Sequence, residues 1–168
     1  MSSESPRFSN IALRPVGPND YDFLVAVYGS TRADELALVP WTPEQQQLFV
    51  RSQFAAQQDH YAKKYPAASH DIIVAENRPV GRLYVARLDH ELRIVDITLL
   101  PADRNAGIGS YLIKQLLEEA DRSGKFTSIY VEEFNPSLRL FERLGFLRSE
   151  QHGIYVLMRF DPNQEFKQ

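Results

Sequence analysis

One loop constrains the fold of this chain more than any other segment, because it joins a strand-like run to an amphipathic helix through residues with little side chain. The loop reads Arg104-Asn105-Ala106-Gly107-Ile108-Gly109. It follows the β-branched, apolar residues 93–100 and precedes residues 108–122, whose apolar positions recur at helical spacing. A helix that begins in this way leaves its first N–H groups without intrahelical partners. The sequence therefore predicts an anion site at the start of this helix.

Spacing separates the phosphate-binding loops that such glycines could form. A nucleoside-triphosphate loop requires a Gly-Lys-Ser/Thr ending, which this sequence lacks. A dinucleotide-binding loop requires a third glycine where the chain has Leu112, and its glycines follow the strand without a spacer such as Pro101-Ala102-Asp103. Glu132 lies near the position of the ribose-binding acid of such a loop, so this alternative is weakened and stays open.

A third pattern, Arg/Gln-x-x-Gly-x-Gly/Ala, fits the loop, and a second segment accompanies it downstream. The matching residues are Arg104, Gly107 and Gly109. The second segment begins with Asn135, a suitable helix cap, and ends in Gly145-Phe146, as a helix closed by glycine does. In this order, the two segments resemble the coenzyme A loop and the Asn...Gly-Phe motif of the GNAT superfamily of N-acetyltransferases. The resemblance is at the level of motifs over about residues 96–146 and architectural elsewhere.

This resemblance implies an α/β (α+β) fold with a central, mostly antiparallel mixed sheet of about seven strands, flanked by about four helices. Sequence patterns favour strands at residues 11–14, 71–75, 80–88, 91–100, 126–131 and 152–160, and helices at residues 20–28, 43–64, 108–122 and 135–145. In the last strand, Ile154, Val156 and Met158 would share one face, and Leu112 and Leu116 belong to the predicted core. We expect a single domain spanning residues 1–168, with loose ends at residues 1–8 and 162–168.

Composition limits the function classes. A net charge of −3 argues against nonspecific nucleic-acid binding. Because there are no cysteines, disulfides, thiol catalysis and cysteine-ligated metal are excluded, and no histidine spacing predicts a metal site. No apolar run reaches membrane-spanning length and the first residues lack a signal-peptide core, so we expect a cytoplasmic protein that does not bind membranes. Pairing as a homodimer is expected only by analogy with similar domains.

The resemblance implies that acetyl-coenzyme A is a co-substrate and that an amine of a small molecule or peptide attacks its thioester directly in a ternary complex. The pyrophosphate would lie on the backbone N–H groups of the loop, from Asn105, Ala106, Gly107, Ile108, Gly109 and Ser110. Arg104 would add a charge or hold the loop. The pantetheine arm would pair with the strand before the loop, at Thr98, Leu99 and Leu100.

Asn135 and Phe141 complete the predicted cofactor site. Phe141 stands where many family members have the tyrosine credited with protonating the thiolate, and phenylalanine cannot donate a proton. Another group such as Tyr130 or a water could serve, or the thiolate leaves without a general acid. The simplest interpretation is that Phe141 packs beside the pantetheine sulfur.

Asp96 is the first candidate for the general base, because it is a carboxylate within an otherwise apolar strand and burial would raise its pKa. The alternative is that Asp96 pairs with Arg82 or Arg87 on the neighbouring strand. Tyr130 lies where some family members place a catalytic glutamate, although a strand tyrosine is more often a packing residue. Glu132 and Glu133 end the same strand near the expected cleft, and such paired carboxylates are usually solvated.

Acceptor choice in this family usually depends on the region between the first strand and the hairpin. Here that region offers Tyr28, Arg32, Glu35 and Trp41, the only tryptophan. Glu35 and Arg32 could bind the ammonium and carboxylate of a zwitterionic amine or of a peptide N-terminus, against an aromatic wall. Alternatively, Trp41 fills a gap between helices while Arg32 and Glu35 form a surface ion pair.

Overall fold

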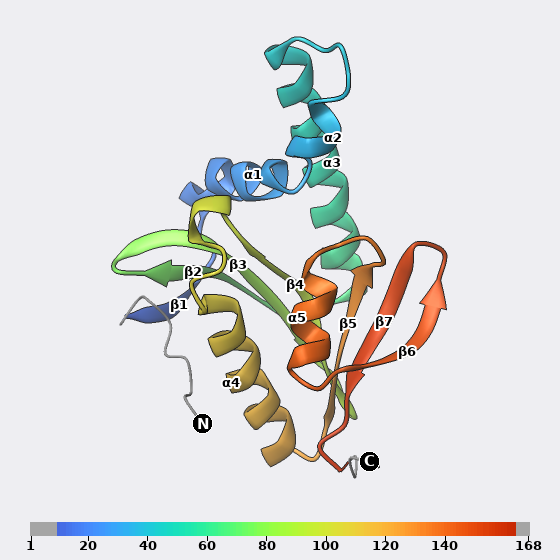
Figure 1. The fold of residues 1–168 in the computed structure, drawn as a ribbon. Coiled ribbons are helices and arrows are strands. Elements are labelled where there is room, and N and C mark those ends of the chain that lie inside the picture. The colour runs from blue at the N-terminus through green and yellow to red at the C-terminus, as the bar shows by residue number, and fades with distance from the viewer. Residues whose placement is uncertain (1–9, 164–168) are drawn as a thin grey trace.

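The computed structural model describes residues 10–163, which are organised around a seven-stranded sheet in the order β1-β2-β3-β4-β5-β7-β6 (Figure 1). The strands are β1 (Ile11–Pro15), β2 (Ser69–Ala75), β3 (Arg78–Arg87), β4 (Glu91–Leu99), β5 (Phe126–Glu132), β6 (Leu147–His152) and β7 (Tyr155–Phe160). Each neighbouring pair is antiparallel except β4 and β5, which are parallel. The predicted mixed, mostly antiparallel sheet is therefore confirmed.

Five α-helices accompany this sheet in the described part of the chain. They are α1 (Tyr21–Ser30), α2 (Ala33–Leu36), α3 (Pro43–Lys64), α4 (Ile108–Arg122) and α5 (Ser137–Arg143), with 3-10 turns η1 (Pro18–Asp20) and η2 (Pro101–Asp103). The bounds of α3 are those predicted. Thr42 and Gln45 form a capping box around Pro43, which stabilises the start of this helix. The single-turn α2 was not expected. None of these helices is both long enough and apolar enough to cross a membrane.

The helices cover the two faces of the sheet separately. Ile73 packs into a cluster with residues of α4 and α5, whereas its neighbour Ile72 packs with residues of α1 and α3. Alternate strand residues point to opposite faces, so α4 and α5 lie on one face and α1 and α3 on the other. Leu112 and Leu116 of α4 are buried in the first cluster, as predicted.

The C-terminal part of the sheet differs from the prediction. Residues 152–160 do not form one strand, because the chain turns at Gly153 (φ 62°) and returns as β7. Ile154 lies in this turn, 54% exposed, while Val156 and Met158 are buried. All six residues of β6 are exposed, so no apolar alternation marks β6 as a strand.

The start of α5 also differs in detail. Pro136, and not Asn135, occupies the N-cap position. The Asn135 side chain instead accepts a hydrogen bond from the backbone N–H of Ser137 at 2.9 Å, so it still closes the turn before the helix. Gly145 follows α5 with φ 101°, as predicted for the end of this helix. The predicted loose ends lie outside the described residues, apart from Pro162 and Asn163.

A β-bulge and a short parallel pairing shape the middle of the sheet. Ile94 pairs with Val85 and Asp96 pairs with Tyr84, so Val95 is an extra residue on β4. The bulge keeps Asp96 and Thr98 on the face of α1 and α3. The pairing of β4 with β5 ends at Ile94, and beyond it the two strands diverge (Figure 1). The edge of β4 toward β5 is thus left open near Thr98.

Candidate active site

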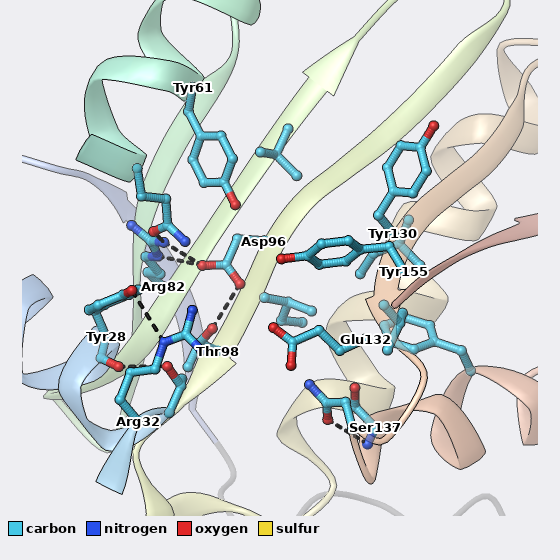
Figure 2. Close-up of a pocket in the computed structure, with 18 residues that line it drawn as sticks. Tyr28, Arg32, Tyr61, Arg82, Asp96, Thr98, Tyr130, Glu132, Ser137 and Tyr155 are labelled. Atoms are coloured by element: carbon cyan, nitrogen blue, oxygen red, sulfur yellow. Dashed lines mark hydrogen bonds and ion pairs between the residues drawn. The ribbon is translucent and has the colours of Figure 1, made fainter. Parts of the chain in front are cut away.

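A pocket of about 220 Å³ lies where β4 and β5 diverge (Figure 2). Side chains from α1, α3, β3, β4, β5, α5 and β7, and from the segments that follow α1 and β5, line this pocket. They include Tyr28, Arg32, Tyr61, Arg82, Asp96, Thr98, Tyr130, Glu132, Asn135, Phe141 and Tyr155. The volume is several times that of a water molecule, about 30 Å³ in the liquid. The pocket can therefore hold a small polar group.

The loop before α4 has the backbone geometry of an anion site. Asn105 (φ 61°) and Gly107 (φ 88°) both adopt left-handed conformations, and no side chain caps the helix after Gly107. A Cβ on Gly109 would meet its nearest neighbour, Leu140, at 3.8 Å, so protein packing does not require glycine there. The N-terminus of α4, with the positive end of its dipole, is open to a ligand.

Two arginines hold this loop in place. Asp103, which is 2% exposed, forms an ion pair with Arg78 of β3 at 2.9 Å between Nη2 and Oδ1. Arg104 donates from Nε to the Leu99 carbonyl at 3.0 Å and from Nη2 to the Ser30 hydroxyl of α1 at 3.4 Å. Arg104 thus holds the loop, the second of its two predicted roles, and ties it to α1. The partnership of Arg78 with Asp103 was not predicted, since 25 residues separate them.

Asp96 lies in the wall of the pocket with both oxygens engaged. Arg82 donates from Nε to Oδ2 at 2.7 Å, and Thr98 donates from its hydroxyl to Oδ1 at 2.8 Å. The second alternative from the sequence, an ion pair with Arg82, is therefore the arrangement observed. Arg87 binds Glu119 instead, at 2.6 Å. The role of Asp96 as a base stays a prediction.

Arg82 is the most deeply buried charge of the site, at 1% exposure. Besides Asp96, its guanidinium donates to Gln58 at 3.1 Å and to Gln57, both on α3, and it lies 5.6 Å from the centre of the Phe54 ring. Each of these contacts compensates for the loss of water around a buried cation. In the sequence, only the positions of Arg82 and Asp96 within apolar strands indicated this network.

Four tyrosines line the pocket, and they point in different directions. Tyr155 extends from β7 toward Asp96, whereas the Tyr130 hydroxyl points away from Asp96 (Figure 2). The Tyr130 ring instead covers the Arg93 guanidinium, 4.9 Å from the ring centre. Burial and the neighbouring Asp96 carboxylate raise the pKa of Tyr61, so its hydroxyl is a neutral hydrogen-bonding group. Sequence analysis did not select Tyr61 or Tyr155.

Of the four predicted acceptor-binding residues, two line the pocket and two lie outside it. Tyr28 and Arg32 line the pocket, and the Arg32 Nε donates to the Tyr28 hydroxyl at 3.2 Å. Glu35 lies outside it and pairs with Arg32 at 3.1 Å. Trp41 also lies outside and packs on the Phe49 ring, 5.2 Å between centres. The geometry of Glu35 is that of the second alternative, an ion pair with Arg32. Trp41 is 40% exposed, and neither of its two predicted roles is tested by this contact.

Phe141 and Asn135 lie together at the α5 end of the pocket. Phe141 is 1% exposed and packs edge-on against Phe146, 5.2 Å between ring centres. Its ring contributes an apolar part of the pocket lining. This position suits the packing role suggested for Phe141 by the sequence.

Glu132 extends from the end of β5 into the pocket (Figure 2). Within residues 10–163, no group donates a hydrogen bond to its carboxylate, in contrast to Asp96. The neighbouring Glu133 lies outside the pocket and accepts from Gln151 at 3.0 Å. The sequence placed both glutamates near the cleft and expected both to be solvated.

Comparison with known proteins assigns the family. Residues 31–146 match the family model described as the acetyltransferase (GNAT) family. This match spans more than half of the chain and includes both motifs, so the chain belongs to the GNAT acetyltransferase family. A search of curated proteins gave no match.

Solved structures show the same fold at low sequence identity. The PaiA N-acetyltransferase from Thermoplasma acidophilum, in complex with coenzyme A, has a TM-score of 0.69 at 14% identity, over 90% of this chain and 99% of that one. A GNAT family acetyltransferase from Elizabethkingia anophelis, with acetyl-coenzyme A bound, has a TM-score of 0.58 at 16% identity, over 91% and 99%. An acetyltransferase from Thermus thermophilus has a TM-score of 0.63 at 17% identity, over 90% and 96%.

Proposed function

We propose that this protein is an acetyl-coenzyme A-dependent N-acetyltransferase that transfers an acetyl group to a primary amine of a small molecule or peptide. The observation that carries the proposal is the junction of three features: an open α4 N-terminus, an open β4 edge near Thr98, and a pocket between β4 and β5. Together they can hold a phosphate group, an extended arm and an acceptor in line. This arrangement supports direct attack by the amine in a ternary complex.

The cofactor residues are proposed from the same geometry. The pyrophosphate would lie on the N–H groups from Asn105 to Ser110, and the pantetheine arm along Thr98, Leu99 and Leu100. Because Arg104 already binds the Leu99 carbonyl, pairing of the arm would use other backbone groups of this segment. Asn135 and Phe141 would flank the end of the arm, where the thioester reacts. Acetyl-coenzyme A and coenzyme A are the molecules bound in two of the similar structures.

A second candidate is a non-catalytic domain of this fold that binds acyl-coenzyme A as a sensor. Phe141 favours it, because a buried phenyl ring cannot protonate the departing thiolate. However, an ordinary thiol has a pKa of about 8.5, so a thiolate is a good leaving group and the absence of a tyrosine at this position does not prevent catalysis. Turnover of any amine would exclude the sensor.

The test is calorimetric titration of the purified protein with acetyl-coenzyme A, paired with a thermal shift measurement. We expect micromolar binding (Kd of about 1 to 100 μM) that raises the melting temperature. A nicotinamide dinucleotide serves as the control ligand, because it would bind if the loop were of the dinucleotide type. Absence of coenzyme binding would overturn the proposal.

Gly107→Trp is the matching loop variant. The left-handed conformation at Gly107 and the bulk of the indole should together abolish acetyl-coenzyme A binding, while the core beneath the loop stays folded. Gly124→Trp is its control, since Gly124 is also left-handed (φ 68°) but lies at the far end of α4, with no atom within 4 Å of a Cβ. Retained affinity in the Gly107 variant would refute the loop assignment.

A further inference from the structure

We infer that Glu132 of β5, rather than Asp96 of β4, binds the acceptor ammonium and takes its proton. This inference rests on the proposed function and assigns a catalytic residue that the two family motifs do not include. It depends on where the two carboxylates point and on what already binds them.

The strand pattern of β5 directs Glu132 to the pocket. Ile129 and Val131 are buried in the cluster under α4, so the alternate residues Tyr130 and Glu132 face the other side. The Tyr130 ring packs on the Arg93 guanidinium. Glu132 lies two residues further along β5, and its side chain reaches the space between the diverged strands (Figure 2). The Glu132 carboxylate therefore lies where an acceptor would enter.

Asp96 is less suited to accept a proton, because its charge is needed by a buried partner. The Arg82 guanidinium is 1% exposed, and Asp96 is the only carboxylate that pairs with it within residues 10–163. Protonation of Asp96 would leave a buried cation without its counter-charge, a change that is strongly unfavourable. The Glu132 carboxylate pairs with no buried cation within residues 10–163, so its charge is free to attract a cation.

The surroundings of Glu132 suit an ammonium. Tyr155 pairs with Glu132 in the register of β5 and β7, and its ring extends over the pocket above the carboxylate (Figure 2). Tyr28 and Tyr61 line the pocket from the opposite side. Aromatic faces and hydroxyls around a carboxylate bind a primary ammonium through charge, hydrogen bonds and cation–π contacts.

The proton and bond changes balance as follows. The bound ammonium gives one proton to the Glu132 carboxylate, and the neutral amine nitrogen forms a bond to the thioester carbonyl carbon. The carbon–sulfur bond breaks, and the sulfur leaves with the electron pair. The second proton lost by the nitrogen as the amide forms passes to the thiolate, and Glu132 returns its proton to solvent. One amide, one thiol and one released proton result.

The experiment compares four proteins: wild type, Glu132→Gln, Glu132→Asp and the matched control Glu133→Gln. Thiol release from acetyl-coenzyme A is followed with a panel of ethanolamine, phenethylamine, lysine, putrescine and an alanine tripeptide. In Glu132→Gln we expect kcat/KM to fall about 10²- to 10⁴-fold, and the acidic limb of its pH profile to disappear. Glu132→Asp should recover part of the rate, and Glu133→Gln should match wild type.

Binding measurements separate the outcomes. Acetyl-coenzyme A affinity and melting temperature should be unchanged in Glu132→Gln, because the carboxylate is placed on the acceptor side. If wild type acetylates none of the amines, the proposed function fails and this inference with it. If wild type is active and Glu132→Gln keeps its rate and pH profile, only the role of Glu132 is overturned. Loss of acetyl-coenzyme A binding in this variant would likewise overturn it, by moving Glu132 to the cofactor site.

Discussion

The face of the sheet under α4 and α5 is closed by aliphatic and aromatic side chains, whereas the face under α1 and α3 also holds charged and polar groups. Leu112, Ile113 and Phe141 are buried on the first face in one apolar cluster. On the second face, Arg82 and His70 lie beside Asp96 and a group of tyrosines. Both faces of the sheet bury apolar clusters, and only the second face also holds the buried charges of the candidate site. The buried charges on the second face stabilise the fold only while their partners are present.

The largest effect should come from Arg82→Met on the polar face. This change leaves Asp96 with only the Thr98 hydroxyl and should lower the free energy of unfolding by about 3 kcal/mol or more. Adding Asp96→Asn should recover part of the loss, because it removes the stranded charge. Denaturant titration of the single and double variants measures both changes. Equal stability of the two variants would show that charge pairing is not what Arg82 contributes.

Leu112→Ala tests the apolar face. It removes a side chain that is 2% exposed, and the cavity should cost about 3 kcal/mol of unfolding free energy. No change of a polar neighbour should rescue this variant, in contrast to Arg82→Met. Thermal unfolding, with Leu38→Ala as an exposed control (87% exposed), measures the difference. A loss no greater than that of the control would contradict the placement of Leu112 in the core.

Arg104→Gln tests the link between the loop before α4 and helix α1. We expect a larger effect on acetyl-coenzyme A binding than on the free energy of unfolding. The variant loses the guanidinium that joins the Leu99 carbonyl to the Ser30 hydroxyl. Acetyl-coenzyme A should bind about tenfold more weakly, as expected when about 1.4 kcal/mol of loop ordering is lost. Arg122→Gln, at the far end of α4, is the control in the same titration. Unchanged affinity would mean that the loop is held without Arg104.

The sequence predicted the parts of the molecule that depend on neighbours along the chain. Pro43 and the apolar positions after it predicted α3, and the glycines predicted the loop before α4. It could not predict β6, whose residues are all exposed, or the pairing of Arg78 with Asp103. It also left two interpretations of Asp96, because a carboxylate in an apolar strand looks the same whether its partner is a substrate or an arginine on the next strand.

The smallest effect concerns the pH dependence of stability, which should arise on the polar face at His70. Burial, and then the charge of Arg82, lower the pKa of His70 to about 4, while the Asp96 carboxylate opposes the shift. In the unfolded chain the pKa is about 6.5, so unfolded protein binds more protons between these values and stability falls as pH drops through this range. Tyr84, stacked 4.5 Å from the His70 ring, faces it from β3.

His70→Phe should therefore remove part of the acid sensitivity. The Nε2 atom of His70 is buried and has no hydrogen-bond partner within residues 10–163, so phenylalanine fills the space without losing a bond. The difference in melting temperature between His70→Phe and wild type should favour the variant more at about pH 5 than at about pH 8. The exposed His90→Gln should track wild type at both pH values. If His70→Phe keeps the full pH dependence of wild type, the acid sensitivity belongs to carboxylates elsewhere, and the polar face carries less of the cost than its buried charges suggest.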